Sequence, residues 1–313
     1  MLPLPGSKGG SAEGASLSRI SEETLVNMSR PPQTSSIQKW KDTPTRSVDV
    51  AGTKFAYRQL GPATGVPVIM LNHWGAVLDN FDPRIVDGIA ATRPVIAFNY
   101  RGVGASGGKT ALTVAEMAED AIAFIRALGF EEVDLLGFSL GGFVAQDIVL
   151  KEPDLIRKVI LTGTGPAGGE GIEKVGAVPW PLIIKGMLTF RDPKFYLFFT
   201  STANGRRAAK DFLKRLKERK ADRDKPITVG AFLRQLNAIK AWGTQAQQDL
   251  GAIRKPVLVA NGDQDKMVPS GNSIDLARRL PNAELVLYED AGHGGTFQYH
   301  EAFVKKALEF LAR

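Results

Sequence analysis

Short apolar runs alternate with helical segments over most of the chain, and this alternation limits the possible fold more than any other sequence feature. Strands that are apolar on both faces and separated by helices are typical of a parallel sheet. Before them, two alternating segments flank an Ala51-Gly52 turn and predict a β-hairpin. We therefore expect an α/β fold, a mostly parallel doubly wound sheet with an N-terminal β-hairpin. The hairpin strands are expected at residues 48–50 and 54–60, and the apolar runs occupy residues 67–71, 95–98, 133–136, 159–161, 257–260 and 285–287.

Helical periodicity is clear between these runs. Residues 113–128 carry one apolar face and stop at Gly129, residues 140–151 stop before Pro153, and residues 299–311 close the chain. One long stretch breaks the alternation, because it has helical period without a strand pattern and predicts a helical cap inserted between two strands. Its helical segments are residues 182–188, 193–199, 204–220 and 228–242.

The domain division follows from these patterns. The core is expected at residues 45–165 and 252–313, and the cap at residues 166–251. Residues 1–44 are rich in Ser, Gly and Pro, with only a weak helical pattern at residues 17–28, and predict a partly disordered arm.

Composition excludes several classes of protein. The 313 residues include no cysteine, so disulfides, zinc ribbons, iron–sulfur ligation and a thiol nucleophile are ruled out. Three dispersed histidines make a poor metal site, and we expect no metal and no cofactor. The apolar runs are far shorter than the roughly 18–20 residues that cross a bilayer, and no secretory signal pattern begins the chain. These features predict a cytoplasmic protein.

Most of the net charge of +7 lies in one segment, since residues 206–225 hold ten basic and four acidic residues. Its apolar positions share one helical face, including Phe212 and Leu216, and leave Lys210, Lys214, Arg215, Lys217 and Arg219 on the opposite face. This periodicity favours a solvated amphipathic helix over a nucleic-acid or membrane surface.

Gly137-Phe138-Ser139-Leu140-Gly141 lies directly between an apolar strand and an apolar helix. The G-x-S-x-G spacing suits a sharp turn that holds the serine hydroxyl at a helix N-terminus, where the Leu140 amide can stabilise negative charge. Ser106 sits in a second match to this spacing but is separated from both neighbouring elements. Ser139 is therefore the expected nucleophile, and Ser106 belongs to a glycine-rich loop.

A serine nucleophile needs a base and an acid that orients the base. Of the three histidines, His293 lies in a glycine-rich loop after a predicted strand, where α/β sheets place ligands; His73 and His300 are the alternatives. Asp265 and Asp263 both follow another strand at the same sheet edge. Asp263 also suits an Asx turn.

From about residue 48 to residue 312 the chain resembles the α/β-hydrolase superfamily, most closely its esterase/haloperoxidase-like branch with a helical cap. The order Ser139, Asp265, His293 is that family's order of nucleophile, acid and base. Residues 262–269 resemble its G-x-x-D-x-x-V-P turn, which favours Asp265 over Asp263. Residues 101–106 resemble its R-G-x-G-x-S loop.

The chain departs from the family at two places. Asn72 and His73 stand where the family's oxyanion loop has His-Gly, and the alignment makes the Trp74 amide the second oxyanion donor beside Leu140. Asn99 stands where the family has aspartate.

The resemblance implies a serine hydrolase that cleaves an ester or lactone of a small substrate, without nucleic acid. A serine at this position argues against the dehalogenases and epoxide hydrolases of the same fold. Carbon–carbon bond hydrolysis, cofactor-free perhydrolase or haloperoxidase activity, and a slow-turnover receptor remain alternatives, and a homodimer is possible. Aromatic and apolar residues of the elbow and cap are the pocket candidates: Trp74, Phe138, Leu140, Trp180, Phe190, Phe195, Tyr196, Phe198, Phe199 and Trp242.

Overall fold

The computed structural model describes residues 1–3, 38–177 and 191–313. The chain divides into two compact units, Met1–Ile37 and Gln38–Arg313, and every element below belongs to the second unit. That unit begins before the expected boundary at residue 45. Trp40 explains the difference, because the residue is 2% exposed and its ring meets the Phe81 ring edge-on, with 6.1 Å between centroids.

A mixed eight-stranded sheet forms the centre of this unit, in the order β1-β2-β4-β3-β5-β6-β7-β8. β1 and β2 form the expected hairpin, β2 pairs antiparallel with β4, and all other pairs are parallel. The expected fold class is confirmed. The strands are β1 (Arg46–Val50), β2 (Thr53–Leu60), β3 (Val68–Leu71), β4 (Val95–Phe98), β5 (Val133–Phe138), β6 (Ile156–Thr162), β7 (Val257–Gly262) and β8 (Ala283–Tyr288).

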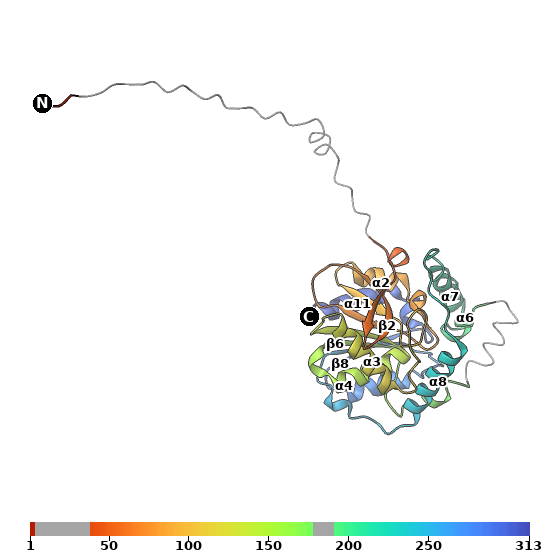
Figure 1. The fold of residues 1–313 in the computed structure, drawn as a ribbon. Helices are drawn as coiled ribbons and strands as arrows, with labels where there is room; N and C mark the ends of the chain where they lie inside the picture. Colours follow the sequence, from red (N-terminus) through yellow and green to blue (C-terminus); the bar gives the residue numbers. More distant parts are fainter. Residues whose placement is uncertain (4–37, 178–190) are drawn as a thin grey trace. The chain divides into compact units, whose positions relative to one another are not determined.

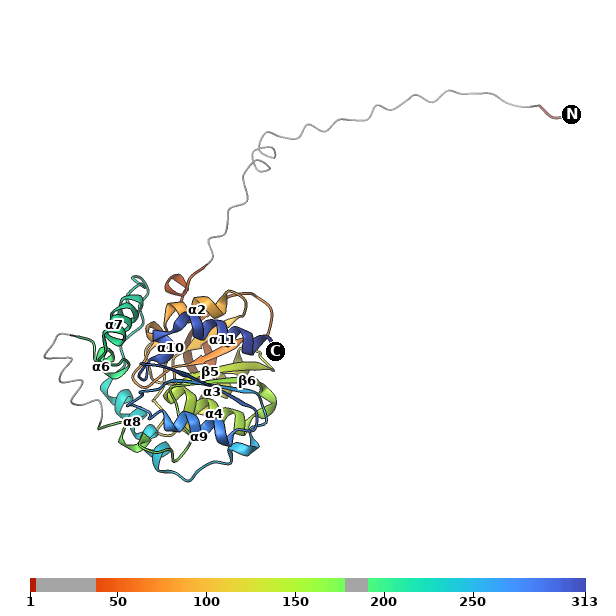
Figure 2. The same ribbon diagram turned by 180° about the vertical axis from the view of Figure 1, so that it is seen from behind.

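Helices cover both faces of the sheet, as Figure 2 shows. One core contains the apolar side chains of α3, α4 and α9, and a second core on the other face contains those of α2 and α11. The helices are α2 (Pro83–Ala90), α3 (Val114–Ala127), α4 (Leu140–Lys151), α9 (Gly271–Arg279), α10 (Gly295–Gln298) and α11 (His300–Ala312). Short 3-10 turns are η1 (Trp40–Asp42), η2 (Leu78–Asn80), η3 (Pro153–Leu155), η4 (Ile172–Lys174) and η5 (Leu250–Ala252).

The edge strand β8 differs from the expectation of a strand buried on both faces. Leu285 and Leu287 are 38% and 36% exposed, and β8 is the last strand of the sheet, paired with β7 alone. The central strands β3, β4 and β5 are buried at every position.

The cap lies between β6 and β7 and contains α6 (Lys194–Leu197), α7 (Ala203–Arg215) and α8 (Val229–Thr244). These helices lie together at one side of the sheet (Figure 1). No strand occurs in the described stretches 163–177 and 191–256. The helix expected at residues 182–188 lies outside the described residues, and the one expected at 204–220 ends at Arg215.

Two arginines of the basic run are buried, which corrects the expectation that they lie on a solvated face. Arg215 and Arg219 are 8% and 6% exposed. The Arg215 guanidinium lies 2.6 Å from Oδ2 of Asp82, the residue that caps α2, and Arg219 donates to the Thr43 carbonyl at 2.8 Å. These side chains reach core acceptors and so fasten the cap to the core.

Candidate active site

Ser139 sits on a strained turn between β5 and α4. Its φ is 55° and its ψ −118°, a conformation that non-glycine residues rarely adopt. A Cβ at Gly137 would lie 2.3 Å from the Gly141 carbonyl oxygen, and one at Gly141 would lie 2.1 Å from the Leu71 carbonyl oxygen. The two glycines are therefore required by the close approach of strand and helix. The Ser139 hydroxyl makes no capping bond to α4.

Ser106, the serine of the second G-x-S-x-G match, has a different environment. Its Oγ accepts a hydrogen bond from the Ala56 amide at 2.9 Å and donates to the Asn99 carbonyl at 3.0 Å. The hydroxyl joins β2 to the end of β4 and is occupied by these structural bonds.

His293 and Asp265 meet at the carboxyl edge of the sheet. Nδ1 of His293 lies 2.7 Å from Oδ2 of Asp265, with both side chains buried. The other oxygen, Oδ1, accepts from the Met267 and Val268 amides at 2.8 and 3.0 Å. Asp265 is thus fixed by its own loop and orients the imidazole. Asp263 is exposed and accepts a bond from the Ala291 amide at 3.2 Å, in the loop that carries His293.

Ser139 and His293 line the same cavity of about 210 Å³, which we call the Ser139 cavity. Its walls come from loops at the carboxyl ends of the strands and from cap helices α6 and α8. Besides Ser139 and His293, the lining includes His73, Trp74, Phe143, Val175, Lys194, Leu197, Phe198, Phe232, Ile239, Met267 and Val268. Most of this surface is apolar, which suits a small, largely apolar ligand.

Several pocket candidates lie elsewhere. Trp242 is 1% exposed and stacks on Phe143 at 5.4 Å, so it supports the cavity wall from behind. Phe138 lies beneath His293, with ring centroids 4.9 Å apart, and Phe195 and Phe199 pack within the cap and against α7. These positions correct the expectation that the four rings line the cavity. Trp180 and Phe190 lie outside the described residues.

The loop of residues 72–75 follows β3 and reaches the elbow, because Leu71 pairs with Gly137 in the sheet. Cap helix α8 holds this loop at two points: Trp74 Nε1 donates to the Phe232 carbonyl at 2.9 Å, and Gln235 Oε1 accepts from the Gly75 amide at 2.9 Å. The Trp74 ring also packs on the Phe232 ring, 4.3 Å between centroids. The cap therefore helps to position the 72–75 loop, which lines the Ser139 cavity through Trp74 and Gly75.

The backbone amides of Trp74 and Leu140 donate to no protein acceptor within the described part of the chain. Trp74 lies in the loop after β3, and Leu140 is the first residue of α4, which follows the adjacent strand β5. Free amide donors beside a nucleophilic serine are the groups that can stabilise an oxyanion.

His73, an alternative for the base, lines the Ser139 cavity, and its Nδ1 lies 2.8 Å from the Trp74 carbonyl oxygen, where His293 has a carboxylate. Burial lowers the pKa of His73 to about 3, with the Lys194 charge as the next cause. His300 opens α11 and does not line the Ser139 cavity. Among the described residues, no group of three or more His, Asp or Glu side chains could hold a metal ion. No helix in this part of the chain is long and apolar enough to span a membrane.

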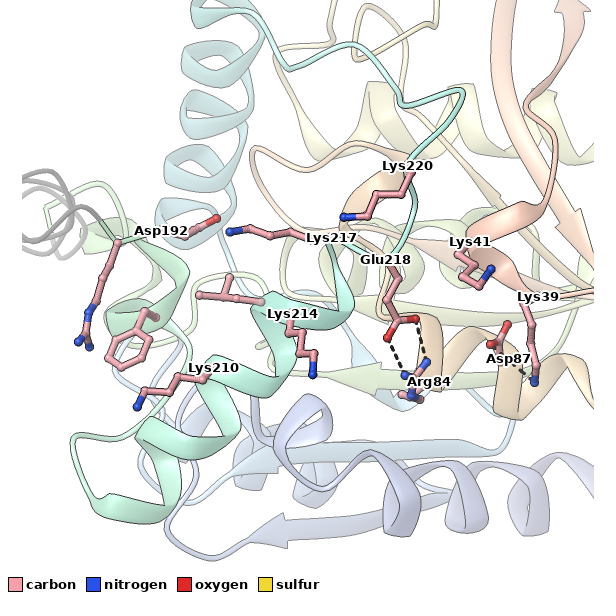
Figure 3. Close-up of a pocket in the computed structure, with 13 residues that line it drawn as sticks. Lys39, Lys41, Arg84, Asp87, Asp192, Lys210, Lys214, Lys217, Glu218 and Lys220 are labelled. Carbon is pink, nitrogen blue, oxygen red and sulfur yellow. Dashed lines mark hydrogen bonds and ion pairs between the residues drawn. The ribbon is translucent and has the colours of Figure 1, made fainter.

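A larger hollow of about 1230 Å³ lies on the surface beside α7 and contains none of the three residues Ser139, Asp265 and His293 (Figure 3). Its lining is mainly basic and includes Lys210, Lys214 and Lys217. Its carboxylates already have partners, since Glu218 pairs with Arg84 at 2.6 Å. The exposed lysines form the solvated face expected for this helix.

Comparison with known proteins agrees with this arrangement. The model of the alpha/beta hydrolase fold family matches residues 66–298. A solved structure described as an alpha/beta hydrolase fold protein from Chitinophaga pinensis is 39% identical, with a TM-score of 0.83, over 88% of this chain and 99% of that one.

Two curated relatives carry different names. A protein of Agrobacterium fabrum named "Putative carbamate hydrolase RutD" is 28% identical over 69% of this chain and 82% of its own length. The 2-hydroxymuconate semialdehyde hydrolase of Pseudomonas putida is 28% identical over 71% of this chain and 78% of its own length. The family model covers most of the compact unit, and the chain is therefore a hydrolase of the alpha/beta hydrolase fold family.

Proposed function

We propose that this hydrolase cleaves a carboxylic ester or lactone of a small, largely apolar substrate through an acyl-enzyme on Ser139. The observation that carries the proposal is the shared cavity: a serine on a strained elbow and an Asp265-bonded histidine line one apolar chamber. These groups are the nucleophile, base and orienting acid of serine hydrolases.

In this mechanism His293 takes the proton of the Ser139 hydroxyl as Oγ bonds to the carbonyl carbon of the substrate. The amides of Trp74 and Leu140 stabilise the resulting oxyanion. The same histidine gives the proton to the departing oxygen, and a water then attacks the acyl-enzyme with His293 again as base. Asp265 holds the imidazole in the tautomer that these transfers need.

Carbon–carbon bond hydrolysis is the second candidate, and one observation favours it: a relative at 28% identity is named 2-hydroxymuconate semialdehyde hydrolase. The cavity volume of about 210 Å³ favours a short acyl group in either case.

Intact-mass spectrometry after treatment with a fluorophosphonate tests the nucleophile. We expect a single adduct on the wild type and none on Ser139→Ala, with the adduct retained on Ser106→Ala. Turnover of p-nitrophenyl esters of two to eight acyl carbons, measured in parallel, tests the bond type. Labelling without ester turnover would shift the proposal to carbon–carbon substrates or to a receptor, and absence of labelling would overturn the serine mechanism.

A further inference from the structure

The Ser139 cavity contains a second imidazole that the proposed mechanism does not use. His73 lines the cavity and is 5% exposed. It packs against the same two phenyl rings as His293. The centroid of the His73 ring lies 5.5 Å from that of Phe138 and 5.2 Å from that of Phe198. The centroid of the His293 ring lies 4.9 Å from that of Phe138 and 5.4 Å from that of Phe198. The two imidazoles are therefore close neighbours in one wall.

A backbone contact determines which nitrogen of His73 carries the proton. Nδ1 lies 2.8 Å from the Trp74 carbonyl oxygen. A carbonyl oxygen only accepts hydrogen bonds, so Nδ1 must be the donor. In the neutral ring the lone pair is then on Nε2, which can only accept.

Nε2 of His73 is buried and has no hydrogen-bond partner in the described part of the chain. Buried polar atoms without partners are uncommon in folded proteins, because the atom loses its hydration and gains nothing in return. Because His73 itself lines the Ser139 cavity, a hydrogen-bond donor on a ligand bound there is the partner that would satisfy this atom.

The ring also stays uncharged under ordinary assay conditions. Burial and the Lys194 ammonium keep the pKa of His73 at about 3. Lys194 is the first residue of α6, and its Nζ lies 3.3 Å from Oδ2 of Asp192. At neutral pH the imidazole is thus a hydrogen-bond acceptor and not a cation.

We propose that Nε2 of His73 is a substrate-binding acceptor, and that the preferred acyl groups carry an O–H or N–H donor near the scissile carbonyl. Hydroxyacyl and amidoacyl esters are the substrate classes that fit. The inference rests on the proposed hydrolase function and narrows its substrates. A site built to bond a donor discriminates strongly against the analogue that lacks it, because the buried acceptor is then left unpaired.

Two pairs of nearly isosteric phenyl esters test this inference on the full chain. Phenyl hydroxyacetate and phenyl propanoate differ by OH against CH3, and phenyl N-acetylglycinate and phenyl 4-oxopentanoate differ by NH against CH2. Each kcat/KM is divided by the rate constant for the uncatalysed reaction. For the wild type we expect the donor-bearing member of at least one pair to be preferred by about tenfold or more.

Two variants separate the acceptor from the fold of the loop. His73→Asn keeps an N–H near the position of Nδ1, which bonds to Trp74, and removes Nε2; His73→Gln restores an acceptor oxygen near Nε2. We expect the preference ratio to collapse in His73→Asn and to return in part in His73→Gln. Because both esters of a pair meet the same loop, a displaced loop lowers both rates and leaves the ratio intact.

A second measurement does not depend on turnover. In Ser139→Ala, the ¹⁵N spectrum of the three histidines should show Nε2 of His73 as an unprotonated nitrogen whose shift moves when phenyl hydroxyacetate is added. A wild type with no preference in either pair would overturn the inference. If His73→Asn lowers kcat/KM equally for both esters of a pair, the inference is also overturned, and His73 acts by holding the 72–75 loop or by positioning the deacylating water. Absence of fluorophosphonate labelling in the wild type would mean that the proposed function itself has failed.

Discussion

Nδ2 of Asn99 lies 2.6 Å from Oδ2 of Asp224 and joins the end of β4 to the cap. The same carboxylate oxygen accepts from the Leu78 amide at 3.2 Å. The family resemblance places an aspartate at residue 99, so the amide is a departure with a structural reason. Here the residue must donate, because its partner is a carboxylate.

Replacing Asn99 by Asp should therefore destabilise the protein. Two carboxylates would meet where a donor and an acceptor now pair, at a cost of about 2 kcal/mol. We expect a lower Tm at pH 8 and a smaller deficit at pH 5, because a shared proton relieves the repulsion. The double variant Asn99→Asp/Asp224→Asn should recover part of the loss. Equal stability of Asn99→Asp and wild type at pH 8 would show that the bond is unimportant.

Gln235 should act on kcat although it does not line the Ser139 cavity. Gln235→Leu removes the acceptor of the Gly75 amide and loosens the loop that presents the Trp74 amide, so we expect kcat to fall by about tenfold with little change in KM. Gln235→Glu keeps an acceptor oxygen and should retain most of the rate. Asn237→Ala, at an exposed position of the same helix, serves as the control. A change in KM alone would argue against a positioning role.

The two aspartates after β7 can be separated by one pair of variants. Asp265→Asn should lower kcat by about three to four orders of magnitude, because an amide holds His293 in the wrong tautomer. Asp263→Asn keeps an acceptor for the Ala291 amide and should change kcat only a few-fold. The reverse order of effects would transfer the orienting role to Asp263.

Stability should depend on pH through His73. Its pKa is about 3 in the folded chain against 6.5 as the ordinary value, so between these values the unfolded chain binds a proton that the folded chain does not. The free energy of unfolding then falls by about 1.4 kcal/mol for each pH unit below 6.5. Chemical denaturation measures the free energy of unfolding at pH 7.5 and at pH 5. Its decrease between these pH values should be smaller by about 2 kcal/mol in His73→Asn than in the wild type. Identical losses would mean that His73 is protonated in the folded state.

The strands were predictable because their signal is local. Runs such as residues 95–98 and 257–260 are apolar at successive positions, and β4 and β7 occupy them. Helix α2 was missed although Asp82-Pro83 is a start signal, with Asp82 accepting from the Arg84 amide at 3.0 Å. Its eight residues carry too short a pattern to stand out from loop sequence.

The lining of the cavity was not predictable in the same way. Phe198 faces the Ser139 cavity whereas its neighbour Phe199 does not, and Phe143 lines it from α4. Which of several aromatic residues meets the substrate depends on how the cap seats on the core. The basic run shows the same limit, since Arg215 is buried against Asp82 although periodicity puts it on the polar face.

That buried Arg215–Asp82 ion pair has a consequence for how the molecule melts. With side chains 9% and 0% exposed, neither charge can be left alone in the interior without a large penalty. Lifting the cap would leave the Asp82 carboxylate, which caps α2, without its charge partner, so the cap and the N-terminus of α2 are energetically coupled. Cap and core should therefore unfold in one cooperative step, seen as a single calorimetric peak rather than two.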